Sequence, residues 1–120
     1  MVAHTGDLVA TIKAIQAVDE CLGEVISSVL SVGGVTLITA DHGNAEELIK
    51  LQTGEIDKEH STAPVPLIIV GQNFQVAETS ENKADLTLLT PSGVLADIAP
   101  TILKILNLDQ PPEMTGRSLV

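Results

Sequence analysis

Aromatic residues and cysteine are almost absent from this chain of 120 residues. Phe74 is the only aromatic residue. The chain therefore lacks the aromatic side chains on which nucleobases stack, and nucleic acid is not expected as a partner. Cys21 is the only cysteine, which excludes an intrachain disulfide and fits a reducing, cytoplasmic setting. The place of Cys21 in a helical apolar pattern predicts a packed core thiol rather than a nucleophile.

Basic residues and long apolar runs are also scarce. Six basic against sixteen acidic residues give a net charge of -10, which repels polyanions and anionic membranes unless metal ions reverse the local sign. Apolar runs cover only a few residues, and no basic region with a following apolar stretch opens the chain. Neither a membrane span nor a secretion signal is therefore expected. A hydrophobic content of 44% suffices for one domain with a modest core.

Apolar residues recur at helical spacing between residues 7 and 31. Those separated by three or four positions are Leu8, Ile12, Ile15, Val18, Leu22, Val25 and Val29. This spacing predicts one long amphipathic helix. We expect Thr5 or Gly6 to cap its start and Gly33–Gly34 to end it, so that His4 lies just before the helix N-terminus.

Two short segments have the composition of buried strands. Val35–Thr39 and Pro66–Gly71 are β-branched or apolar almost throughout, as expected for strands covered on both faces of a parallel sheet. Together with the helix they predict an α/β fold with a partial parallel sheet flanked by helices. Asp41 and His42 directly follow the first strand, at the end where such sheets bind ligands.

The remaining segments connect or follow these elements. Residues 40–65 form a long connection with a turn at Gln52–Glu55, and long connections of this kind are usually functional or disordered. Residues 75–83 are polar and expected to be exposed, and residues 86–89 are expected to add an edge strand. Pro91–Gly93 opens a last helical region, with Pro100 in the first turn of a segment that stops at Asn107. Its apolar residues are expected to face the sheet: Ile98, Ile102, Ile105 and Leu106.

The three histidines all stand in predicted loops next to the ends of elements. His4, His42 and His60 share this placement, and histidine is a common ligand for transition metals. With the neighbouring carboxylate of Asp41, they predict a metal site. The alternatives are ordinary surface histidines and a turn in which Asp41 bonds its own backbone. Ser61 could suggest a nucleophile, but no basic partner is fixed beside it, which favours a polar turn.

Several segments closely resemble cofactor-independent phosphoglycerate mutase. The closest are Ala40–Glu46, His60–Pro66 and Glu113–Leu119. Met1–Gly6 looks like the Asp-Met-Val-Gly-His-Thr-Gly segment of that family, and Leu95–Thr101 is similar to a helix motif near its end. The segments occur in the same order as in the family, and the resemblance spans essentially the whole chain.

The resemblance implies a fold, a site and a reaction. The family belongs to the alkaline phosphatase superfamily, so residues 1–120 would be the C-terminal portion of a metal-binding, phosphatase-like domain. Two manganese ions are implied, or alternatively magnesium or zinc, with His4 and His60 on one ion and Asp41 and His42 on the other. The intact enzyme would interconvert 3-phosphoglycerate and 2-phosphoglycerate in glycolysis through a phosphoserine intermediate.

Departures from the family pattern limit what this chain does alone. The family's aspartate ligand before Met1 is absent, Ala3 replaces a glycine, and the nucleophilic serine and substrate-binding residues lie outside the chain. We therefore expect a fragment with no catalytic residue of its own and no activity in isolation. One alternative is a metal-dependent phosphatase or phosphoester hydrolase of the same superfamily. Another is a non-catalytic α/β module that binds a metal or a protein, or associates with itself.

Overall fold

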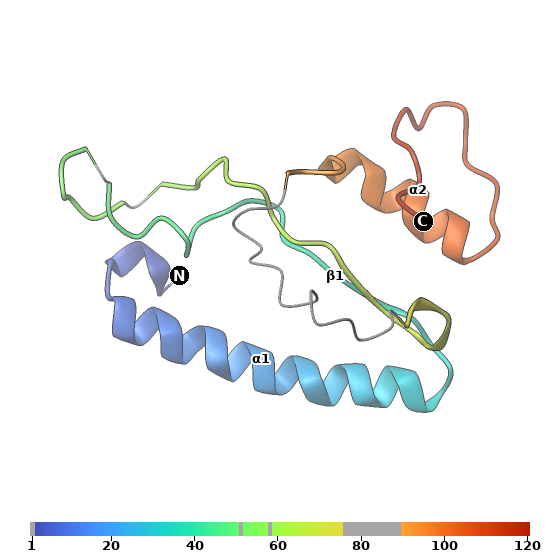
Figure 1. The fold of residues 1–120 in the computed structure, drawn as a ribbon, viewed down its shortest axis with the longest axis horizontal. Coiled ribbons are helices and arrows are strands. Elements are labelled where there is room, and N and C mark those ends of the chain that lie inside the picture. Colours follow the sequence, from blue (N-terminus) through green and yellow to red (C-terminus); the bar gives the residue numbers. More distant parts are fainter. Residues whose placement is uncertain (1, 51, 58, 76–89) are drawn as a thin grey trace. The chain divides into compact units, whose positions relative to one another are not determined.

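The computed structural model describes residues 2–50, 52–57, 59–75 and 90–120. The chain divides into two compact units, Met1–Ala77 and Glu78–Val120. The first contains the 3-10 helix η1 (Ala3–Thr5), helix α1 (Leu8–Ser31), strands β1 (Thr36–Ile38) and β2 (Ile68–Val70), and the 3-10 helix η2 (Gln72–Phe74) (Figure 1). The second contains the 3-10 helix η4 (Leu95–Asp97) and helix α2 (Ile98–Ile105). The predicted polar stretch after Gln75 and the predicted edge strand at 86–89 lie outside the described residues.

Helix α1 confirms the helix predicted from apolar spacing. Its N-cap is Asp7, whose carboxylate accepts a hydrogen bond from the Ala10 amide at 2.9 Å, so the expectation of Thr5 or Gly6 was wrong. The Thr5 hydroxyl is instead bonded to the carbonyl of Val2 at 2.7 Å. At the other end Gly33 adopts a φ of 73°, the left-handed conformation expected of a helix stop.

Strands β1 and β2 confirm the α/β class but pair differently from the prediction. They are antiparallel, with Leu37 opposite Ile69, whereas a parallel sheet was expected. The expected covering of both faces was also wrong, since no residue of either strand is fully buried and Ile68 is 46% exposed. An apolar run does not show which way the neighbouring strand runs. The described part of the connection between the two strands contains no helix, so the chain turns back without the crossover that a parallel pair requires.

Helix α2 packs the second unit around polar side chains. Pro100 lies in its first turn and Asn107 follows its end with a φ of 53°, as predicted. The buried positions are not the expected apolar ones, since Ile102 and Leu106 are 39% and 59% exposed. Thr101 is fully buried, and a Cβ on Gly116 would collide with the backbone at Ala96. The C-terminal segment therefore lies close against the start of the helix.

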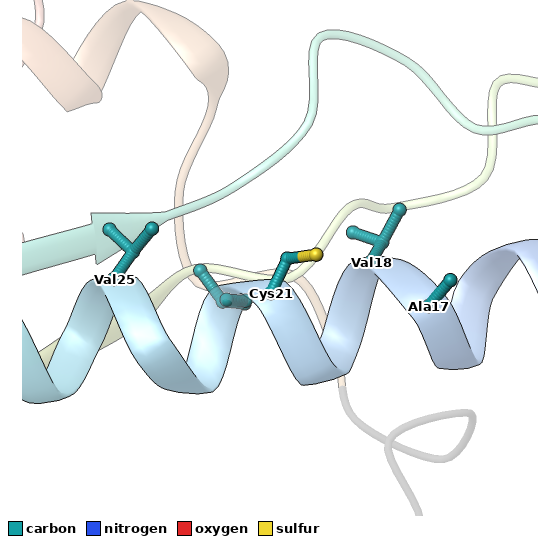
Figure 2. A pocket seen from close by; sticks show the side chains of 5 residues that line it. Ala17, Val18, Cys21 and Val25 are labelled. Atoms are coloured by element: carbon teal, nitrogen blue, oxygen red, sulfur yellow. The ribbon is translucent and has the colours of Figure 1, made fainter.

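One side of α1 carries apolar side chains that no described residue of the first unit buries. Figure 2 shows Ala17, Val18, Cys21 and Val25 along an open groove on this helix. Cys21 is exposed, so the prediction of a packed core thiol was wrong, because helical spacing shows which face is apolar and not whether another element covers it. No described helix is long and apolar enough to span a membrane.

Candidate metal site

Three histidine rings from separate segments meet in the first unit. His4 lies in η1, His42 follows β1, and His60 belongs to the segment that leads into β2. The rings of His42 and His60 are stacked, with centroids 3.7 Å apart and planes inclined by 13°. The rings of His4 and His60 are tilted by 47°, with centroids 5.5 Å apart. The structure thus brings together the three histidines that the sequence singled out.

Asp41 lies at the edge of this histidine group. Its Oδ1 atom is 3.6 Å from Nε2 of His42. The Asp41 side chain is 88% exposed and that of His42 is 37% exposed, so both side chains reach the solvent. On the other side of its ring, Nδ1 of His42 is 3.1 Å from the carbonyl oxygen of Gly43. A proton on Nδ1 donated to this carbonyl leaves Nε2, the nitrogen nearer Asp41, with its lone pair available.

The loops that carry His42 and His60 are paired through their backbones. The Ser61 amide donates a hydrogen bond to the carbonyl of Gly43 at 2.9 Å, and these two residues form an isolated antiparallel pair. The Ser61 hydroxyl accepts a hydrogen bond from the Ala63 amide at 3.1 Å. This local bond agrees with the prediction of a polar turn at Ser61.

Glu46 is a functional candidate that the sequence did not single out. Its Oε1 atom accepts a hydrogen bond from the Ser61 hydroxyl, and its Oε2 atom accepts one from the Asn44 amide at 2.9 Å. Partial burial raises the pKa of Glu46, but hydrogen bonds from Ser61 and backbone amides, with the nearby His42, lower that pKa below its ordinary value. The only signal in the sequence was the position of Glu46 at the end of the Ala40–Glu46 motif.

The donors are arranged in pairs and not as a larger cluster. Across the described part of the chain, no three His, Cys, Asp or Glu side chains are placed to bind one ion together. Imidazole lone pairs lie in the plane of the ring, so the stacked rings of His42 and His60 cannot direct both lone pairs at an ion between them. Asp41 Oδ1 and His42 Nε2 are close to each other, and the rings of His4 and His60 are adjacent and tilted rather than stacked.

Comparison with known proteins defines the class of this chain. Residues 1–110 match the family model described as the metalloenzyme superfamily. The chain belongs to this superfamily.

Within the superfamily, relatives of this chain include 2,3-bisphosphoglycerate-independent phosphoglycerate mutases. The protein of that name from Clostridioides difficile is 46% identical over 120 residues, and the one from Cyanothece sp. is 52% identical over 121 residues. Each match covers 100% of this chain and 22% of the relative. The chain therefore spans about a fifth of the length of these relatives, and the resemblance noted from the sequence motifs is confirmed.

The fold has a counterpart among solved structures. A crystal structure of Leishmania mexicana phosphoglycerate mutase at low cobalt concentration is similar with a TM-score of 0.69 and 30% sequence identity. The match covers 98% of this chain and 22% of the mutase chain. This likeness confirms a fold of the phosphoglycerate mutase, alkaline-phosphatase-like type, present here as a fragment.

Proposed function

We propose that this chain is the C-terminal, metal-binding portion of the phosphatase-like domain of a cofactor-independent phosphoglycerate mutase. The intact cytoplasmic enzyme would interconvert 3-phosphoglycerate and 2-phosphoglycerate through a phosphoserine, with phosphoglycerate as its substrate partner. The observation that carries this proposal is the meeting of His4, His42 and His60 from three separate segments. The identity of 46% to 52% with mutases across the whole chain supports it.

The four side chains would serve two ions, which we propose to be manganese. His4 and His60 would bind one, and Asp41 and His42 the other. Two donors at about 2.1 Å from one ion lie about 3.0 Å apart at the right angles of octahedral coordination and about 3.4 Å apart at tetrahedral angles. Asp41 Oδ1 and His42 Nε2 are 3.6 Å apart, slightly beyond this range, so the exposed Asp41 side chain would shift a little to bind the ion. Bound ions would lower the pKa of the nucleophilic serine and neutralise charge on the transferring phosphoryl group.

Metal titration tests the assignment of the ligands. Two protein donors for each ion predict weak manganese binding by the chain alone, and the double variant Asp41→Ala, His42→Ala should weaken this binding further. Asp19→Ala, which removes an exposed carboxylate on α1, serves as the control and should bind manganese as the unchanged chain does. Equal binding by the double variant and the unchanged chain would show that the ligands were wrongly assigned.

Activity assays test the reaction. The purified chain with manganese should not turn over phosphoglycerate, because it contains no candidate nucleophile of the mutase type. A longer protein that carries this segment should interconvert the two phosphoglycerates without releasing inorganic phosphate. Release of phosphate from both phosphoglycerates and from a generic phosphate monoester would instead identify a hydrolase of the same superfamily.

A further inference from the structure

We propose that Glu46 is a positioning residue that holds the loops of His42 and His60 together so that the two rings stack. This inference rests on the metal site proposed above. The proposal is based on the hydrogen bonds among three residues, Glu46, Asn44 and Ser61, which we call the Glu46 network.

The Glu46 network connects both loops through one carboxylate. Oε2 of Glu46 accepts a hydrogen bond from the amide of Asn44, two residues after His42. Oε1 accepts a hydrogen bond from the hydroxyl of Ser61, the residue after His60. A further bond runs from the Asn44 side-chain amide to the carbonyl of Glu59 at 3.3 Å. The two loops are therefore joined by the Ser61 bond to Glu46 and the Asn44 bond to Glu59, of which the first goes to a charged acceptor, the stronger kind. The Asn44 amide fixes the same carboxylate within the loop of His42.

Both oxygens of Glu46 accept hydrogen bonds from groups of the two loops, as expected of a positioning residue. One carboxylate oxygen is committed to the Ser61 hydroxyl and the other to the Asn44 amide. Asp41, in contrast, is 88% exposed and directs Oδ1 toward His42. We therefore assign Asp41 to the ion and Glu46 to the placement of the loops that present the histidines.

Gly43 supplies the space that the Glu46 network needs. A Cβ atom on Gly43 would collide with Oε1 of Glu46 and with Oγ of Ser61. Its backbone is not in the left-handed region, so glycine is required here for close approach and not for the turn. A side chain at position 43 would therefore have to displace the Glu46 carboxylate and the Ser61 hydroxyl, which would break the bond between them.

Loss of the Glu46 carboxylate should loosen the pairing of the loops, which would then rest on the backbone bond from Ser61 to Gly43 and the Asn44 bond to Glu59. The stacked rings of His42 and His60 are exposed at the surface, so little buried apolar area would keep them together. Groups that orient metal ligands through hydrogen bonds typically contribute about 10- to 100-fold to metal affinity. Glu46→Ala should therefore weaken manganese binding by about that factor.

The first measurement uses the metal-free 120-residue chain. Nuclear Overhauser contacts between the His42 and His60 rings should be present in the unchanged chain and lost in Glu46→Ala. The matched control is Glu47→Ala, which removes the same charge from the neighbouring exposed position and should keep the contacts. Retention of the ring contacts in Glu46→Ala would overturn the proposal whether or not the chain binds metal.

The second measurement is manganese affinity in a pair of variants at position 61. Ser61→Ala removes the hydroxyl donor and should weaken binding, while Ser61→Thr retains a hydroxyl and should restore it. If Ser61→Ala weakened binding only because alanine is smaller than serine, Ser61→Thr would not restore the affinity through its hydroxyl. Equal affinity of Ser61→Ala and the unchanged chain, with loss of the ring contacts, would support the loop placement and overturn the metal ligands assigned above.

Folding of each variant is checked by the helical circular dichroism signal of α1. If Glu46→Ala loses this signal, Glu46→Met replaces it, because methionine has a similar length but no carboxylate to accept the bonds from Asn44 and Ser61. Loss of the ring contacts in Glu46→Met would support the proposal, and their retention would overturn it.

Discussion

Two polar residues form the centre of the second unit. The fully buried Thr101 hydroxyl donates to the carbonyl of Asp97 at 2.7 Å and accepts the Leu119 amide at 3.1 Å. The Asp97 carboxylate accepts the amides of Arg117 at 2.8 Å and Val94 at 3.0 Å. These side chains bind the C-terminal segment to the start of α2 through its backbone.

Replacing Thr101 with valine should destabilise this unit. Valine has nearly the same shape but leaves the Leu119 amide without its acceptor, and an unsatisfied buried donor costs about 1 to 3 kcal/mol. Serine keeps both hydrogen bonds and loses one methyl group, worth about 0.8 kcal/mol. Urea unfolding followed through the Leu119 amide resonance measures the difference, and a valine variant no less stable than the serine variant would contradict the role of the hydroxyl.

Asp97 should make the stability of the second unit depend on pH. The Arg117 and Val94 amides, together with the Arg117 charge, hold the pKa of Asp97 below its usual value although burial raises it. A carboxyl with a depressed folded-state pKa contributes fully above its unfolded-state pKa of about 3.9, and this contribution is lost as pH falls toward the folded-state pKa. Stability should therefore decrease on acidification from neutral pH to below about pH 4.

The variant that tests this dependence is Asp97→Asn. It removes the titrating group, so its stability should change less between pH 6 and pH 3 than that of the unchanged chain. Asp109→Asn, at an exposed position of the same unit, should leave the dependence as it is. Identical pH profiles for Asp97→Asn and the unchanged chain would exclude Asp97 as the source.

Single residues were predictable where their chemistry is distinctive. The convergence of His4, His42 and His60 followed from three histidines next to the ends of elements. Glu46 and Asp97 were not predicted as network centres, because a carboxylate that binds backbone amides looks the same in a sequence as one in solvent. Their partners are set by the folded loops.

Elements were predictable where the periodicity was long. The 24 residues of α1 contain several turns of consistent spacing, whereas β1 and β2 contain three residues each. A run of three apolar residues carries no information on direction or register, which explains why the antiparallel pairing of Leu37 with Ile69 was not foreseen. The position of the cap depends on where the helix starts, and the Thr5 hydroxyl accepts a hydrogen bond from the Asp7 amide, before the first residue of α1.

The N-cap of α1 is open to a direct test. Asp7→Ala removes the acceptor of the Ala10 amide and a favourable charge at the helix N-terminus, so the first unit should lose about 1 kcal/mol of stability. Asp19→Ala removes a carboxylate from the middle of the same helix and should cost no stability. Thermal unfolding followed by circular dichroism measures both, and equal losses in the two variants would contradict the cap.

The whole molecule carries an excess of negative charge that should oppose its compaction. A net charge of -10 produces repulsion that is screened over about 8 Å at physiological ionic strength. Unfolding in about 0.01 M and about 0.15 M sodium chloride should therefore show greater stability at the higher concentration. Choline chloride should reproduce the effect if it is screening, and a decrease in stability with either salt would contradict it.

The backbone bonds at Asp97 and Thr101 have a consequence for solvent exchange. The amides of Arg117 and Leu119 lie in a segment without helix or strand, yet each donates to a side chain that is itself buried. Amide hydrogens exchange with deuterium only when such bonds open. In deuterium oxide, Arg117 and Leu119 should therefore keep their protons longer than the neighbouring Thr115, although the whole segment looks like an irregular tail.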